Sequence, residues 1–182
     1  TVDGVQHPRT IFTLWTEAER NAIGIYTVEI DESKKKNEQW YINTDITYTF
    51  SGGKVTGSYG DATAKAHADT LFTAQDETDG LGTEGDVKTE GLKTILIKEL
   101  KKEVGALLGG TDWYITRKTE KDTAIPSAIS THRDAVRTKQ AEMETAITNA
   151  SDTPALETLY TYTEQEDKSV TRPLGELPTL ED

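Results

Sequence analysis

Two stretches of the 182-residue sequence have the spacing of ligand-binding loops, and both lie in one acidic segment. Gly80-Leu-Gly-Thr-Glu-Gly85 matches the pattern G-x-G-x-x-G, in which a helix N-terminus binds a dinucleotide pyrophosphate. That chemistry needs a strand before the first glycine, whereas here the polar residues 75–79 precede it. Glu84 and Asp86 would also repel an anion. We therefore interpret the glycines as a flexible acidic turn and predict no dinucleotide cofactor.

The same segment can be aligned with a calcium-binding loop in which Gly80 takes the sixth position. Gln75, Glu77 and Asp79 would then take the first three ligand positions, and Asp86 the last. A calcium loop normally opens with Asp and closes with a bidentate Glu, and this segment has neither. A solvated loop is the favoured interpretation, and no metal site is predicted.

The histidines and serines form no evident catalytic arrangement. His67 is two residues from Asp69, and His132 is two from Asp134, so on a helix each pair would point apart. No serine occupies a nucleophile elbow, and we predict that the protein is not an enzyme. The one basic run, residues 34–36, is flanked by acids, which argues against nucleic-acid binding. No apolar run is long enough to predict a membrane span.

The composition indicates a thin core and an acidic surface. Leu, Ile, Val and Phe total 36 residues, about a fifth of the chain, whereas Thr alone accounts for 30. The net charge is -12, and residues 61–90 and 151–182 each contribute -6. We interpret these acidic segments as solvated faces and a loose tail, with docking onto basic partner surfaces as the alternative. Cysteine is absent, which excludes disulfides.

Local patterns predict an α+β fold in four segments. Residues 1–60 are expected to form a small antiparallel β-rich unit, and residues 61–91 an acidic helix and loop linker. A helical body is expected over residues 92–162, and an extended C-terminal arm over residues 163–182. The arm is expected to reach neighbouring subunits, because so small a body leaves little surface on which to bury it.

Within the first segment, Thr16 and Glu19 predict a capping box for a short helix over residues 17–23, which Gly24 terminates. Gly52-Gly53 predicts a tight hairpin. Apolar residues occupy even positions on its strands, which predicts one apolar face: Trp40, Ile42, Ile46, Tyr48 and Phe50. This face is expected to lie against a partner or the helical body, because a lone hairpin cannot bury it.

Further along the chain, Asp61 is expected to cap a helix over residues 62–74. Apolar residues at three- and four-residue steps predict helices over 92–108 and 127–150, which should pack antiparallel. Trp113 and Tyr114 follow a glycine stop, and we expect them to fill the space between these helices. The alternative is that they are exposed and anchor a partner.

The region around these aromatics carries a resemblance to a known group of proteins. It consists of Leu107-Leu108, Thr111-Asp112-Trp113-Tyr114, Ile125-Pro126 and a helix with His132-Arg133 and Val136-Arg137. The run resembles the C-terminal region of small tailed-bacteriophage proteins encoded beside tail-fibre genes, over residues 92–160. Residues 5–25 also resemble the opening of marine-phage proteins. The resemblance implies a protein of virion construction and supplies no catalytic residue.

From these observations we predict a phage virion structural protein of the tail, at the baseplate or at fibre attachment, that acts by protein–protein binding. The alternatives are a tail-fibre assembly chaperone that leaves the particle and, in a third class, a small hydrolase. The expected partners are other tail proteins, in a multi-copy assembly that is synthesised in the host cytoplasm. The candidate partner-binding residues are Trp40, Tyr48, Phe50, Trp113, Tyr114, Arg172 and Leu174.

Overall fold

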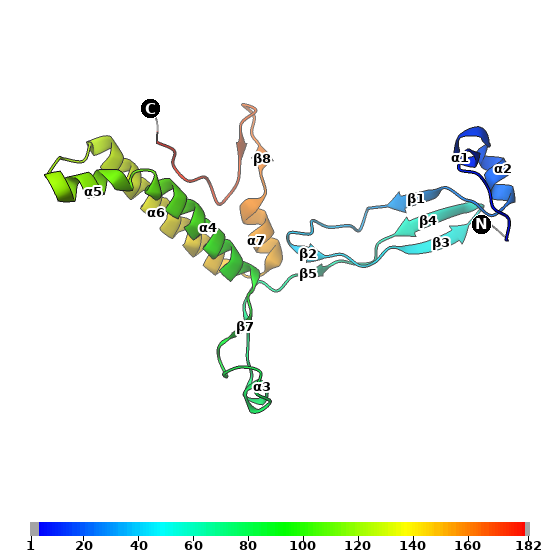
Figure 1. Ribbon diagram of the computed structural model, residues 1–182, viewed down its shortest axis with the longest axis horizontal. Coiled ribbons are helices and arrows are strands. Elements are labelled where there is room, and N and C mark those ends of the chain that lie inside the picture. The colour runs from blue at the N-terminus through cyan, green and yellow to red at the C-terminus, as the bar shows by residue number, and fades with distance from the viewer. Residues whose placement is uncertain (1–3, 181–182) are drawn as a thin grey trace. The chain divides into compact units, whose positions relative to one another are not determined.

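The structure is a computed structural model that describes residues 4–180, and its fold is α+β (Figure 1). The predicted combination of helices with small antiparallel sheets is confirmed. By its internal contacts the chain divides into two compact units, Thr1–Ala64 and Lys65–Asp182. We describe each unit by itself.

The first unit opens with two short helices, α1 (Ile11–Leu14) and α2 (Glu17–Ala22). The capping box predicted for α2 is confirmed, because the Thr16 hydroxyl accepts from the Glu19 amide while the Glu19 carboxylate accepts from the Thr16 amide. Ile11 is buried, and Trp15 meets the His7 ring edge-on, with ring centroids 5.8 Å apart.

Five strands follow: β1 (Val28–Asp31), β2 (Tyr41–Ile42), β3 (Thr47–Ser51), β4 (Lys54–Ser58) and β5 (Thr63–Ala64). The hairpin of β3 and β4 is confirmed, with positive φ angles at Gly52 and Gly53 as a two-residue turn requires. β4 lies between β3 and β1 and runs parallel to β1, so this sheet is mixed. The chain reverses direction between β1 and β3 and again between β3 and β4, so β4 runs in the same direction as β1. β2 and β5 form a separate antiparallel pair.

The second unit begins with a hairpin that carries a helix at its tip: β6 (Thr70–Leu71), α3 (Ala74–Thr78) and β7 (Val87–Thr89). The helix predicted over residues 62–74 is therefore wrong. Strand pairing with β7 overrides the local helix propensity of this stretch. The hairpin brings Gly82 close to the Phe72 ring, from which an added Cβ would lie only 2.6 Å away.

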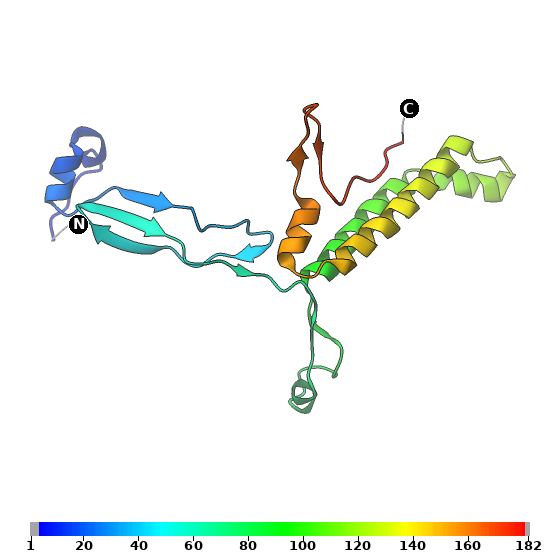
Figure 2. The same cartoon turned by 180° about the vertical axis from the view of Figure 1, so that it is seen from behind.

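Four helices make up the rest of this unit: α4 (Leu92–Gly109), α5 (Asp112–Lys121), α6 (Ser127–Asn149) and α7 (Thr153–Tyr160). α4 leads out to α5, and α6 returns alongside α4 (Figures 1 and 2). Every fourth residue of α4 is buried: Leu92, Leu96, Leu100 and Val104. They share the core with Val136, Met143 and Ile147 of α6 and with Leu156 of α7.

The C-terminal segment does not form the extended arm that the sequence suggested. Strands β8 (Thr163–Glu164) and β9 (Val170–Thr171) make a small hairpin, and the chain then returns to the helical body. Leu174 is only 3 % exposed, and its amide donates to the Leu159 carbonyl at 3.0 Å. The expectation of a free arm is wrong because several contacts hold the segment: burial of Leu174 contributes about 1.5–3 kcal/mol, and Arg172 lies over the rings of Tyr160 and Tyr162.

Candidate functional site: exposed apolar surfaces

The three-stranded sheet of the first unit has one uncovered apolar face. Residues paired across neighbouring strands point to the same side, and the pairs Val28–Val55–Phe50 and Ile30–Gly57–Tyr48 place six residues there. Val28 and Ile30 are 43 % and 44 % exposed, and Tyr48 and Phe50 are 61 % and 59 % exposed. We call these six residues the apolar sheet face.

Gly57 makes this face continuous across its middle strand. A Cβ at this position would lie 2.8 Å from Cδ1 of Ile30 and 2.9 Å from both Cγ2 of Ile46 and Cε1 of Tyr48. The missing side chain therefore lets the flanking side chains lean over β4. In the other row of paired residues, Val28–Val55–Phe50, the ring of Phe50 lies 4.7 Å from that of Tyr26. Side chains from all three strands thus form one surface.

The opposite side of the same sheet is polar. Lys54 and Glu29 form an exposed ion pair at 3.2 Å. The hydroxyl of Thr47 donates to the Ser58 carbonyl, and that of Thr49 to the Thr56 carbonyl. The sheet is therefore amphipathic, with one polar face and one exposed apolar face.

A second, smaller apolar surface lies on α5. Trp113 is 51 % exposed and Ile115 is also exposed, so the expectation that Trp113 fills the space between two helices is wrong, whereas Tyr114 is half-buried. The Trp113 and Tyr114 rings lie 3.7 Å apart, and the Arg117 guanidinium lies 4.7 Å and 5.2 Å from their centroids. The helix that forms here turns Trp113 outward, which favours the alternative of an exposed anchor.

Thr111 and Asp112 have a structural role in the helical unit. Arg133 of α6 is buried and donates to the Leu108 carbonyl at 2.7 Å and to the Thr111 hydroxyl at 2.6 Å. It also pairs with Asp112 at 2.8 Å. Arg133 thereby joins the end of α4, the start of α5 and the N-terminal third of α6.

The remaining candidate contact residues serve the internal fold. Trp40 is 3 % exposed and belongs to the core of the first unit, so it is not available as a surface anchor. Leu174 is buried in the helical body. Arg172 lies over the rings of Tyr160 and Tyr162 and pairs with Glu176 at 2.8 Å. Of the seven candidates, Tyr48, Phe50 and Trp113 are the exposed ones.

Val28 and Ile30 belong to the apolar sheet face but were not among the predicted contact residues. The alternation over residues 25–30 was a usable signal for a strand with one apolar side. The parallel pairing of β1 with β4, which brings these two side chains beside Tyr48 and Phe50, has no local signal. Only the tertiary arrangement joins them into one surface.

The segments that resembled ligand loops are arranged differently from such loops. The glycines at 80–85 follow α3 and lead into the strand β7, instead of following a strand and leading into a helix. Gln75 and Asp79 lie at the ends of α3 and hydrogen-bond to each other at 2.8 Å. Within residues 4–180, His, Asp and Glu side chains form no group of three that could hold a metal ion.

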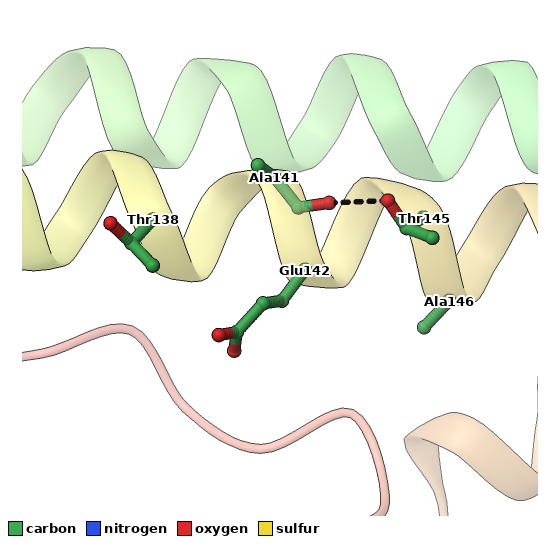
Figure 3. Close-up of a pocket in the computed structure, with 5 residues that line it drawn as sticks. All are labelled: Thr138, Ala141, Glu142, Thr145 and Ala146. Atoms are coloured by element: carbon green, nitrogen blue, oxygen red, sulfur yellow. Dashed lines mark hydrogen bonds between the residues drawn. The ribbon is translucent and has the colours of Figure 1, made fainter.

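A shallow hollow lies on the exposed side of α6 (Figure 3). Its five lining residues all come from this one helix: Thr138, Ala141, Glu142, Thr145 and Ala146. The Thr145 hydroxyl donates to the Ala141 carbonyl at 2.8 Å, and Glu142 pairs with Lys139 at 3.5 Å. These polar groups are occupied by neighbours on their own helix, so the hollow offers no converging donors for a ligand.

In comparisons with known proteins, no family model, no curated protein and no solved structure matches the chain. Among the described residues, no helix has the length and apolar character that crossing a bilayer requires.

Proposed function

We propose that this chain is a structural protein of a bacteriophage virion, located in the tail, that works by binding other proteins. The observation that carries the binding role is the uncovered apolar sheet face. Side chains of this size are rarely left together in water on a monomeric protein, and such patches mark interaction sites. The assignment to a phage tail is supported by the sequence resemblance around Thr111-Asp112-Trp113.

The division of the chain supports the same role. Among residues 4–64, the buried apolar side chains are Ile11, Trp40 and Tyr41, which is a small core for a unit of this size. The second unit has its own core between α4, α6 and α7. A helical unit with its own core, joined to a sheet with an exposed apolar face, is suited to binding neighbouring proteins in an assembly. The exposed Trp113 on α5 gives the helical unit a contact of its own, since Trp is enriched at binding hot spots.

Mass spectrometry of purified phage particles tests this proposal. Particles from the genome that encodes the chain are expected to contain it at a fixed ratio to the major tail protein. A variant with Tyr48→Ser and Phe50→Ser is expected to be depleted from the particles. The matched control, with Thr47→Ser and Thr49→Ser on the polar side of the same strand, is expected to incorporate normally.

Absence of the wild-type chain from intact particles would overturn the structural role. If fibres then failed to assemble without the chain, the assembly-chaperone alternative would replace it. Normal incorporation of the Tyr48 and Phe50 variant would show that the apolar sheet face is not the binding surface.

A further inference from the structure

We propose that the N-terminus of α6 binds a small organic anion, in which a carboxylate or phosphate group is attached to a short apolar body. The site is an open hollow of about 440 Å³ between the first turns of α6 and residues 178–180 of the C-terminal segment. We call it the N-terminal hollow of α6. The inference goes beyond the proposed function and does not depend on it.

The first turn of α6 has backbone amides that lack an acceptor. No side chain caps this 23-residue helix, and its first turn contains no acidic residue. The Pro126 carbonyl accepts from the amides of Ile129 and Ser130. Within residues 4–180, nothing accepts from the amides of Ser127 and Ala128, and both residues line the hollow. Free amides at a helix N-terminus carry partial positive charge and bind anionic groups.

The buried side chain of His132 points to a ligand independently of the helix terminus. His132 is only 8 % exposed and lines the hollow one turn after Ala128. Among the described residues, none forms a hydrogen bond or ion pair with its imidazole. An imidazole carries at least one N–H donor in either protonation state. Because the ring is otherwise enclosed, a ligand in the hollow is what this donor can meet.

Two hydroxyl groups lie on the same side of the helix as His132. Ser127 and Thr131 line the hollow, and within the described part of the chain their hydroxyls form no hydrogen bond. No acidic side chain lines the hollow within residues 4–180. Asp134, the nearest acid along α6, pairs with Arg137 at 3.2 Å. Free amides, hydroxyls and an imidazole therefore meet at one place without a competing carboxylate.

The rest of the lining is apolar and determines the kind of anion. It consists of Ala128 and Ala135 on α6 and of Pro178 and Leu180 in the C-terminal segment. A few polar groups beside an apolar wall are typical of sites for small organic ligands. The net charge of the chain is -12, which opposes anions from a distance, so weak binding is expected.

An NMR titration of the full-length chain tests the inference, with sodium phosphate, acetate and butyrate as probes at fixed pH and ionic strength. Saturable shifts are expected at the amides of Ser127 and Ala128 and at the His132 ring. The rings of His7 and His67 lie elsewhere and serve as internal references that should not respond. Butyrate is expected to saturate at a lower concentration than acetate, because its longer chain reaches the apolar lining.

Three variants separate the contributions of the helix terminus and the imidazole. Pro126→Asp is expected to keep the helix and abolish binding, because an aspartate at the N-cap itself accepts from amides of the first turn. His132→Leu is expected to weaken binding about tenfold, and His132→Gln, which retains a donor, to recover most of it. Thr138→Ala, on α6 outside this hollow, is the matched control and should bind like the wild type.

Shifts that stay linear in anion concentration, that chloride reproduces, or that survive both Pro126→Asp and His132→Leu would overturn the inference. Equal affinities for acetate and butyrate would overturn the assignment to an organic anion. Glu181 and Asp182 lie outside the described residues. If Glu181→Gln with Asp182→Asn shifted the same three signals, and added anions did not, the chain's own carboxylates would replace the ligand. None of these results bears on incorporation into particles, which tests the proposed function.

Discussion

Arg133 and Asp112 form an ion pair at 2.8 Å between the N-terminal third of α6 and the first residue of α5. The guanidinium side is buried, whereas the carboxylate side chain is 63 % exposed. The two other hydrogen bonds of Arg133 reach the Leu108 carbonyl and the Thr111 hydroxyl, in the turn between α4 and α5. Thr111, Asp112 and Arg133, which lies 22 residues after Thr111, therefore form one structural connection.

The buried hydrogen bonds of Arg133 are expected to stabilise the helical unit more than its ion pair does. Arg133→Met keeps much of the side-chain volume but removes the donors to Leu108 and Thr111, and should cost about 2 kcal/mol of unfolding free energy. Asp112→Asn removes only a partly exposed charge and should cost under about 1 kcal/mol. Urea denaturation of both variants measures the difference. Equal losses would show that the ion pair dominates.

A second prediction concerns Gly91, which immediately precedes α4. An added Cβ would lie 2.3 Å from the carbonyl group of Ala68, and the Gly91 amide donates to Asp69 at 2.7 Å. Gly91→Ala is therefore expected to cost about 1–3 kcal/mol, since backbone must move to admit the methyl group. Gly105→Ala is the matched control. Its Cβ meets nothing within 4 Å, and it should stabilise α4 by about 0.5–1 kcal/mol. Thermal unfolding should shift in opposite directions, and a shared direction would contradict the prediction.

A third prediction concerns the pH dependence of the hairpin around α3. A hydrogen bond from Lys88, together with those from the Thr73 amide and hydroxyl, lowers the pKa of Asp76 from 3.8 to about 2. The folded state thus binds this proton less readily than the unfolded state. The stabilisation from Asp76 is complete above about pH 4 and is lost as the pH falls through about 2.

A carboxylate carbon-13 titration by NMR measures this pKa directly. Lys88→Met removes the largest cause of the shift, so the pKa of Asp76 is expected to move back towards 3.8. An unchanged titration in this variant would show that Lys88 does not hold the carboxylate.

The C-terminal segment is expected to stabilise the helical unit through Leu174. This side chain borders a small hollow with Leu96, Leu100 and Met143, and Leu174→Ala should cost about 2–4 kcal/mol. Val170→Ala removes an exposed side chain of the neighbouring strand and should cost little. Urea denaturation compares the two variants. Equal stabilities would mean that the segment is not anchored at Leu174.

Periodic patterns predicted much of the fold correctly. The steps of three and four residues located α4 and α6, and Gly52-Gly53 located the hairpin, because each signal depends on neighbouring residues. The prediction failed where distant residues decide. β6 pairs with β7 across an intervening helix, and Leu174 is buried by helices that end before residue 161.

The candidate site was predicted only in part, because spacing along the sequence reveals a shared face only for residues of the same strand. Tyr48 and Phe50 alternate along one strand, so their shared apolar side was evident from spacing alone. Trp40 has the same parity, but it lies outside β3 and is buried elsewhere in the unit. Alternate residues share a face only within one continuous strand. The outward position of Trp113 depends on the formation of α5, a helix that was not predicted from the sequence.

Hydroxyl-radical footprinting of the assembled phage tail, read by mass spectrometry, tests most directly whether proteins cover the apolar sheet face. Tyr48 and Phe50 are expected to be strongly protected in the tail compared with the same residues in the dilute, isolated wild-type chain. Tyr162, which is 52 % exposed in the second unit, serves as the internal reference for dose. Protection of Tyr48 and Phe50 several-fold beyond that of Tyr162 is the predicted result. Oxidation of Tyr48 and Phe50 in the tail at the rate seen in the dilute chain would contradict the account.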